Sequence, residues 1–258
     1  MSAGAAPEFD RIADYYDQTR GGLERGERFA AVLSPLLMPG PCLEIGVGTG
    51  VVGTHMRAAG RTVVGIDLSA GMLRHAVGRV DAVVLGSAEQ LPFRDACLDN
   101  SYAVWVLHMT DLDRVLAEVA RVLRPHGRFL SVAAANPPVA GDRISEITWS
   151  MLNELSGPRV IPDSPEELGR RGAKAGLRVA GVREVRQEYT VLPADVADNI
   201  ERRGFSNLLC VDAARWEKVV ESAIAELRAI PGQNSPYQRT TVHSVTILEK
   251  GEERDEGA

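Results

Sequence analysis

Apolar residues along the chain follow two spacings, and these spacings predict the elements of an α/β fold. Short runs rich in β-branched residues, such as 61–68, have the composition of buried parallel strands. Stretches such as 111–123 carry apolar residues three and four positions apart, the period of an amphipathic helix. Strands that alternate with helices predict a parallel, doubly wound sheet. The first five expected strands are one beginning at Cys42, then 61–68, 81–85, 98–106 and 128–134.

The stretch 42–50, CLEIGVGTG, is the most informative part of the chain. Its apolar start indicates a strand, its three glycines a tight turn, and the residues after Gly50 a helix. Glycine permits a positive φ and lets a ligand approach the backbone, and the start of a helix offers unpaired N–H groups. The pattern predicts a site for a nucleotide-like ligand at the carboxyl end of the first strand.

Two ligands are compatible with this loop. Residues 48–53 fit the G-x-G-x-x-G dinucleotide fingerprint, and Asp67 lies where an acid that binds the ribose hydroxyls belongs. Glu44 favours S-adenosylmethionine instead, because a carboxylate repels a pyrophosphate and attracts a sulfonium and an ammonium group. The glycine pattern alone leaves both ligands open.

Two later positions have the chemistry of a binding or catalytic site. Ser87 and the backbone N–H of Ala88 follow the third expected strand and are suited to reading an adenine edge. His108 follows the fourth strand, close to where a transferred methyl group is expected to point. Its imidazole titrates near neutral pH, so we predict a general base. The alternative is that His108 caps the strand–helix junction by hydrogen bonding.

Composition narrows the classes of function. The 258 residues carry a formal net charge of -6, which argues against a dedicated nucleic-acid partner. The three scattered cysteines form no zinc-type pair and fit a reducing cytoplasm. The sequence shows no apolar run of transmembrane length and no carboxylate–histidine group for a metal. We therefore expect a cytoplasmic protein with no metal and no membrane partner.

Four motifs together resemble the class I S-adenosylmethionine-dependent methyltransferases, especially the small-molecule group of methyltransferase type 11. The motifs are LEIGVGTG (43–50), GIDLSAGML (65–73), SAEQLPF (87–93) and ARVLRPHGRFL (120–130). The resemblance implies a Rossmann-like, seven-stranded, mostly parallel sheet. It also implies an antiparallel last strand between the fifth and sixth, and S-adenosyl-L-methionine as cofactor.

The resemblance also implies which residues surround each part of the cofactor. Around the methionine portion, Tyr16 and Arg20 would lie near the carboxylate, the backbone of Ala103 at the ammonium, and Glu44, Gly46 and Gly48 nearby. Asp67 would bind the ribose. The adenine would be bordered by Leu68, Met72, Ser87, Ala88 and Glu89. Two positions depart from the family. Ser87 replaces a common aspartate, and His126 replaces a glycine in a turn, where we expect a negative φ and a changed turn.

We predict a single domain over 1–258, with cap helices in 1–40, a cofactor-binding core in 41–135, and an inserted helical lid in 136–165 and 193–235. The cap and lid helices have a second interpretation, as amphipathic helices that only pack on the sheet. The predicted activity is methyl transfer to an O, N or C atom of a secondary metabolite, quinone or lipid-like small molecule. The alternatives are a tRNA or protein methyltransferase, a non-catalytic cofactor-binding regulator and a dehydrogenase. The sequence leaves open whether the protein forms a homodimer.

Overall fold

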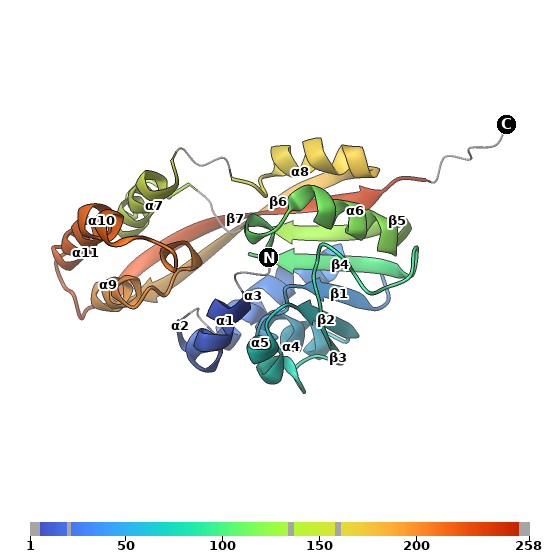
Figure 1. Cartoon of the computed structure of the whole chain (residues 1–258), viewed down its shortest axis with the longest axis horizontal. Helices are drawn as coiled ribbons and strands as arrows, with labels where there is room; N and C mark the ends of the chain where they lie inside the picture. Colours follow the sequence, from blue (N-terminus) through green and yellow to red (C-terminus); the bar gives the residue numbers. More distant parts are fainter. Residues whose placement is uncertain (1–5, 20–21, 134–136, 158–160, 253–258) are drawn as a thin grey trace. The chain divides into compact units, whose positions relative to one another are not determined.

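Seven strands form one sheet in the order β3-β2-β1-β4-β5-β7-β6 (Figure 1). The structure, a computed structural model, describes residues 6–19, 22–133, 137–157 and 161–252. The strands are β1 Cys42–Ile45, β2 Val63–Asp67, β3 Ala82–Leu85, β4 Leu98–Val104, β5 Leu123–Val132, β6 Leu177–Val191 and β7 Tyr237–Lys250. β7 lies between β5 and β6 and is antiparallel to β5, so the predicted sheet is confirmed.

β1 is central to the sheet and determines where the site forms. All four of its residues are buried, as expected for a parallel strand covered on both faces. It pairs in parallel with β2 on one side, through Glu44 and Gly65, and with β4 on the other, through Glu44 and Tyr102. The carboxyl ends of the three strands therefore meet at one edge, where the glycine loop, Asp67 and the residues after β4 come together.

Helices connect the strands at the predicted places. Leu112–Val122 forms α6, whose apolar side includes Val115, Leu116 and Val119, all fully buried. The other helical segments are α1 Ala6–Ile12, η1 Ala13–Tyr15, α2 Tyr16–Thr19, α3 Gly22–Leu33, η2 Ser34–Leu36, α4 Val51–Ala58, α5 Ala70–Ala76, η3 Leu107–Met109, α7 Arg143–Ser156, α8 Pro165–Gly172, η4 Ala173–Ala175, α9 Pro193–Glu201, η5 Ser206–Leu208, α10 Ala213–Arg215, η6 Trp216–Val220 and α11 Glu221–Arg228. The region 1–40, where we expected cap helices, contains α1, η1, α2, α3 and η2.

The chain forms two compact units. The first contains Met1–Ala135, Ile161–Glu184 and Ser244–Ala258, and the second contains Asn136–Val160 and Val185–His243. The second unit has its own apolar core, in which α7, α9 and α11 contribute buried side chains. Most of the segments that we expect to contact the acceptor, 136–165 and 193–235, belong to this unit. Their role as a lid stays a prediction.

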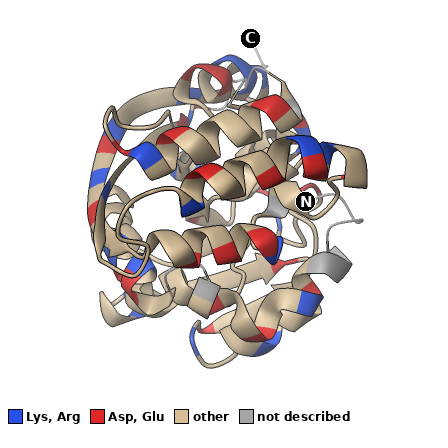
Figure 2. Cartoon of the chain, turned by 90° about the vertical axis from the view of Figure 1, so that its left-hand side faces the viewer, with Lys and Arg blue, Asp and Glu red and all other residues tan. Residues whose placement is uncertain are grey.

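Charged residues of both signs are interspersed on the helices of the second unit (Figure 2). Arg143 of α7 lies 3.1 Å from Glu226 of α11, and Arg228 of α11 lies 2.8 Å from Asp198 of α9. Cations of these helices are thus paired with carboxylates of neighbouring helices. Over the described ranges, no helix is both long and apolar enough to span a membrane.

His126 corrects one prediction about the backbone. We expected a negative φ at this position, but its φ is +63°, in the left-handed region that glycine normally occupies. The backbone next to it is closely packed. A Cβ on Gly127 would lie 2.8 Å from the carbonyl oxygen of Arg124. Histidine tolerates the left-handed conformation better than most residues, so it can occupy this position.

Candidate cofactor-binding site

The loop between β1 and α4 exposes bare backbone at Gly48. Gly46 and Gly48 both have positive φ values, +67° and +54°. A Cβ on Gly46 would lie 2.3 Å from Cγ2 of Val106, so close packing requires glycine there. At Gly48, in contrast, no heavy atom lies within 4 Å of the position that a Cβ would take. The loop thus leaves open space at Gly48, where a ligand can approach the main chain.

Asp67, at the end of β2, joins the loop to the start of α5. Its Oδ2 accepts a 2.9 Å hydrogen bond from the N–H of Gly48, and its Oδ1 accepts one of 2.9 Å from the N–H of Ser69. Only 5% of the residue is exposed. Burial raises the pKa of its carboxyl, while the backbone N–H groups oppose that rise. The group stands beside Gly48, where the sequence predicted an acid for the ribose hydroxyls.

Glu44 is buried beneath the same loop. The hydroxyl of Tyr102 donates a 2.9 Å hydrogen bond to its Oε2, and a Cβ on Gly53 would lie 2.7 Å from that oxygen. Burial raises the pKa of Glu44 to about 8, and Asp67 adds to the rise, whereas hydrogen bonds from Tyr102 and the N–H of Gly53 oppose it. Glu44 therefore carries a proton at neutral pH in the ligand-free chain. It supports the first turn of α4 as well as lying near the predicted methionine position.

The N-terminal helices pack on α5 beside the loop. Oδ1 of Asp10 accepts hydrogen bonds from the Ser69 hydroxyl, at 2.7 Å, and from the N–H of Gly71, at 2.6 Å. Ser69 is the N-cap of α5, and its hydroxyl oxygen accepts a 3.0 Å hydrogen bond from the N–H of Met72. An apolar cluster joins the two elements and contains Phe9, Ala13 and Met72, with Ile12, Tyr16, Leu68 and Met109 packed against them. Three predicted cofactor residues, Tyr16, Leu68 and Met72, thus lie together.

The loop after β3 is tied to the start of α6. The hydroxyl of Ser87 accepts a 3.1 Å hydrogen bond from the N–H of Glu89, and Oε1 of Glu89 accepts one of 3.0 Å from the N–H of Asp111. Ala88 and Ala103 are buried in the core that also holds α6. These bonds fix the shape of the predicted adenine loop, and the contact of Ser87, Ala88 and Glu89 with adenine stays a prediction.

His108 is half-buried in η3, directly after β4. Its neighbour Met109 packs on the cluster that contains Leu68 and Met72. η3 therefore borders the predicted adenosine pocket, which is compatible with His108 as a base and with His108 as a structural cap. Arg20, predicted near the methionine carboxylate, lies outside the described residues.

Sequence reasoning missed two residues at this edge, Arg25 and Tyr102. Arg25 is buried on the face of α3 that also carries Phe29 and Leu33. The spacing of four residues between successive members of that face was a signal in the sequence, since a cation does not belong on an apolar stripe without a partner. Tyr102 carried no comparable signal, because its contact with Glu44 depends on the pairing of β1 with β4.

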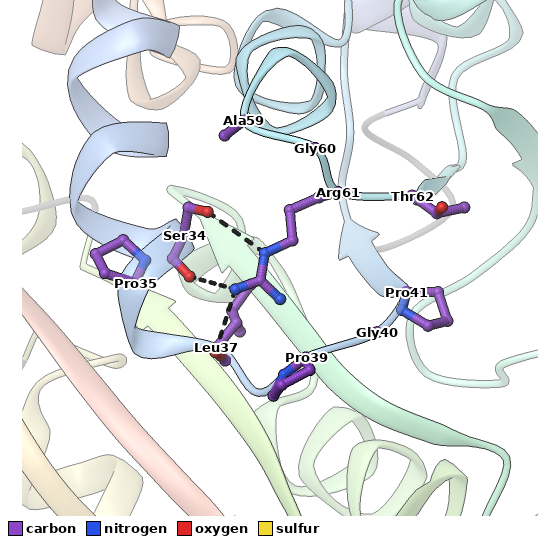
Figure 3. A pocket seen from close by; sticks show the side chains of 10 residues that line it. All are labelled: Ser34, Pro35, Leu37, Pro39, Gly40, Pro41, Ala59, Gly60, Arg61 and Thr62. Atoms are coloured by element: carbon purple, nitrogen blue, oxygen red, sulfur yellow. Dashed lines mark hydrogen bonds between the residues drawn. The ribbon is translucent and has the colours of Figure 1, made fainter.

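A surface pocket also lies at the opposite edge of the sheet, where β1 and β2 begin (Figure 3). Arg61 is the charged residue among its lining residues, and Nη2 of Arg61 donates to the carbonyl oxygens of Ser34, at 2.6 Å, and Leu37, at 3.2 Å. The guanidinium thus secures the turn after α3. Because the N–H donors of Arg61 are bonded to backbone carbonyls, we assign this pocket a structural role and no ligand.

Comparison with known proteins places this geometry in a family. A methyltransferase domain family matches residues 43–131. The ubiquinone/menaquinone biosynthesis C-methyltransferase UbiE of Acidiphilium cryptum is 31% identical over 210 residues, which cover 69% of this chain and 84% of that protein. A malonyl-[acyl-carrier protein] O-methyltransferase of Pectobacterium atrosepticum is 38% identical over 155 residues, covering 57% of this chain and 58% of that protein.

Comparison of the fold with solved structures also finds methyltransferases. A solved structure of an S-adenosylmethionine-dependent methyltransferase from Thermotoga maritima superposes with a TM-score of 0.55 at 20% identity, covering 95% of this chain and 98% of that one. The likeness of the fold agrees with the sequence match across the glycine loop and Asp67. The chain belongs to the class I S-adenosylmethionine-dependent methyltransferases, and it is an enzyme that uses S-adenosylmethionine as its methyl donor.

Proposed function

We propose that the chain binds S-adenosylmethionine between the glycine loop and the N-terminal helices and methylates a secondary metabolite, quinone or lipid-like acceptor. The observation that carries this proposal is the contact between Asp67 and Gly48. The carboxylate of Asp67 lies next to open space over bare backbone, which supports a role for it at the ribose hydroxyls. Leu68 and Met72 supply apolar surface for the adenine, and Tyr16 lies on the same cluster.

The residues of the site act mainly by position. The bound sulfonium supplies a methyl group that is already electrophilic, so the chain needs to align donor and acceptor and exclude water. His108, in η3, is our candidate for removing a proton from the acceptor. A base of this kind accelerates a reaction roughly 10²–10⁴-fold. A base at this place would serve a hydroxyl, an activated carbon or a protonated amine as nucleophile.

The named relatives restrict the acceptor only partly. One acts in ubiquinone and menaquinone biosynthesis as a C-methyltransferase, and another is named for O-methylation of a malonyl group on acyl-carrier protein. We therefore keep oxygen, nitrogen and carbon acceptors in the proposal, and include carrier-linked as well as free small molecules. Cys42, Cys97 and Cys210 are free thiols, which supports our proposal of a cytoplasmic location.

Thermal unfolding with added ligands tests the cofactor assignment. A ligand that binds the folded state raises the apparent stability, and at a given concentration a tighter ligand raises it more. We expect S-adenosylmethionine and S-adenosylhomocysteine to raise the melting temperature and NAD to leave it unchanged. Stabilisation by NAD that exceeds that of both would contradict the proposal. Transfer of a labelled methyl group into pools of quinones, phenols, amines and acyl-carrier thioesters then identifies the acceptor class.

A further inference from the structure

β6 and β7 are neighbours in the sheet and form an antiparallel ribbon whose register follows from two contacts (Figure 1). A Cβ on Gly181 would lie 3.6 Å from Cδ1 of Ile247. Cζ of Arg239 lies 5.7 Å from the ring centroid of Tyr189. Between these contacts the residue number rises along β6 by as much as it falls along β7. The two strands therefore run in opposite directions and keep one register over this interval.

This register places Gln187 of β6 opposite Thr241 of β7, two residues from Tyr189 and Arg239 and on the same face of the ribbon. Nε2 of Gln187 and Oγ1 of Thr241 are both buried without a hydrogen-bond partner among the residues that the structure describes. Gln187 as a whole is only 7% exposed. Opposed side chains of an antiparallel pair have Cβ atoms about 4.5–5.5 Å apart, so the two groups face the same space. Because a buried donor without an acceptor is costly, the pair has the properties of a site whose partner is a ligand.

The charges beside this pair are already balanced. Nε of Arg239 lies 3.2 Å from Oδ2 of Asp142, the N-cap of α7, and its Nη2 donates to the hydroxyl of Ser145. The first turn of α7 therefore lies against this face of the ribbon. Arg239 and Asp142 compensate each other, so a charged ligand group placed next to them would lose its water without gaining a counter-ion. The pair of Gln187 and Thr241 thus favours a neutral ligand group.

Apolar residues border the pair along the ribbon. The same register sets Val191 opposite Tyr237, and both pack against the apolar core of the second unit. In the other direction Val185 is buried opposite His243. Thr241 as a whole residue is half-buried, so the ribbon face reaches the surface of the unit at this position. A neutral oxygen attached to an apolar skeleton matches these surroundings.

We propose that Gln187 and Thr241 bind a neutral carbonyl or hydroxyl oxygen of the methyl acceptor, which carries this oxygen on an apolar skeleton, as quinones, phenols and ketones do. This proposal rests on the proposed function. The amide N–H of Gln187 donates to the oxygen, and the Thr241 hydroxyl donates to a carbonyl or accepts from a hydroxyl. Both residues lie on strands, outside the segments 136–165 and 193–235 that the sequence predicts to contact the acceptor.

Three bicyclic probes test the chemistry of the site. 1-Tetralone carries a ketone oxygen, tetralin lacks it, and 1-aminotetralin carries a protonated amine. Ligand-detected NMR titrations of the full chain measure the three Kd values for the wild type, Gln187→Met and Thr241→Val. The wild type should bind 1-tetralone more tightly than either other probe. Loss of one hydrogen bond predicts a Kd for 1-tetralone that is roughly 3- to 10-fold higher in each variant, with tetralin bound as in the wild type or more tightly.

The other face of β7 offers matched control variants. Gln238→Met and Thr240→Val make the same two changes on residues that point away from the pair, because side chains alternate along a strand. Neither control should alter any of the three Kd values. The proposal is overturned if the wild type does not prefer 1-tetralone, if Gln187→Met and Thr241→Val weaken all three probes equally, or if the controls weaken 1-tetralone as much as they do.

Melting temperatures distinguish a ligand site from a site that holds an ordered water only. Methionine and valine replace the unpartnered polar atoms by apolar groups of similar size, so both variants should melt no lower than the wild type in the absence of ligand. A water bound by the pair would be lost in the variants, and each would then melt lower. A lower melting temperature combined with equal binding of 1-tetralone by wild type and variants would overturn the proposal.

Failure of the proposed function gives a different result. Calorimetry on the same samples measures the Kd of S-adenosylhomocysteine, which should agree within about twofold among the wild type and all four variants, since none of the changed residues belongs to the predicted cofactor site. If the wild type binds neither S-adenosylhomocysteine nor S-adenosylmethionine, the proposed function fails, whatever the probes show. If the cofactor binds normally and the selectivity for 1-tetralone is absent, only the oxygen site at Gln187 and Thr241 is refuted.

Discussion

The hydroxyl of Tyr102 donates a 2.9 Å hydrogen bond to Oε2 of Glu44, and the two side chains come from directly paired positions of β4 and β1. Tyr102 is fully buried and Glu44 is 3% exposed. Burial raises the pKa of Glu44 to about 8, from a reference of 4.5. A proton is therefore retained in the folded protein at a pH where the unfolded chain has released it, and folding stability becomes linked to pH at this position.

Glu44→Gln should remove this pH dependence. In the wild type, Glu44 ionises above pH 4.5 in the unfolded chain but only near pH 8 in the folded chain. Its contribution to stability therefore falls as the pH rises from 4.5 to about 8. At ~1.4 kcal/mol per pKa unit, the loss across this interval is on the order of 3–5 kcal/mol. Urea unfolding from pH 4 to 9 measures it. The two proteins should agree near pH 4 and Glu44→Gln should be more stable at pH 8.5; parallel curves would contradict the assignment.

Cofactor binding should release a proton from Glu44. A sulfonium and an ammonium placed near this carboxyl would favour its charged form and lower its pKa. Calorimetry of S-adenosylmethionine in buffers with different ionisation enthalpies measures the protons released. Between about pH 5 and 8 we expect a release of up to one proton in the wild type and none in Glu44→Gln. A release that persists in the variant would assign the proton to another group.

Local sequence patterns were sufficient for the elements and for part of the site. The β-branched run ending at Asp67 and the glycine spacing before Gly50 predict a strand, a turn and a place for a nucleotide-like ligand, because both signals act over a few residues. Contacts between distant segments were not predictable. The neutral state of Glu44 depends on Tyr102, which is 58 positions away and meets it only through strand pairing. The contact of the Arg25 guanidinium with the ring of Trp105 likewise joins two elements that are far apart in the sequence.

The backbone conformation of His126 was also not predictable from the sequence. A negative φ was expected because most residues avoid the left-handed region, yet the observed value is +63°. The backbone next to His126 is closely packed, since a Cβ on Gly127 would lie 2.8 Å from the carbonyl oxygen of Arg124 and 3.2 Å from that of Asp99. Local preference was therefore overruled by tertiary contacts that a single sequence does not reveal.

Asp67→Ala should weaken cofactor binding through the ribose. Loss of hydrogen bonds to a carboxylate predicts a penalty of about 1–3 kcal/mol in binding free energy. Because Asp67 also accepts the N–H of Gly48, some of the penalty can come from a distorted loop. Comparing S-adenosylhomocysteine with its 2′-deoxy analogue separates the two effects. The penalty should be smaller for the deoxy ligand, and an equal penalty for both would show that Asp67 only shapes the loop.

His108→Ala should slow methyl transfer and leave cofactor affinity unchanged. Removal of a general base predicts a kcat roughly 10²–10⁴-fold lower, with a Kd for S-adenosylmethionine within about twofold of wild type. The assay uses an acceptor identified by labelled-methyl transfer and records kcat against pH. His108→Gln retains hydrogen bonding without basicity and should be as slow as the alanine variant. Recovery of activity in the glutamine variant would instead assign His108 a capping role at the end of β4.

Asp17 should control how long the cofactor stays bound. Its Oδ1 accepts a 2.5 Å hydrogen bond from the Thr49 hydroxyl of the glycine loop, and its Oδ2 lies 2.7 Å from Nη1 of Arg79. These contacts attach α2 to the loop, so Asp17→Asn should loosen the N-terminal segment and raise the dissociation rate of S-adenosylhomocysteine roughly 3- to 10-fold. Stopped-flow fluorescence of the tryptophans provides the rate.

A matched control for this prediction is Asp14→Asn, one turn earlier in the same segment. Asp14 has an 85% exposed side chain and contacts His75 at 3.0 Å, away from the loop itself. An exposed pair of this kind contributes little, so the dissociation rate should stay at the wild-type value. If both variants accelerate release equally, the effect comes from the general charge of the N-terminal segment. If neither does, the contact between Asp17 and Thr49 has no part in retaining the cofactor, and retention then depends on the apolar cluster around Met72.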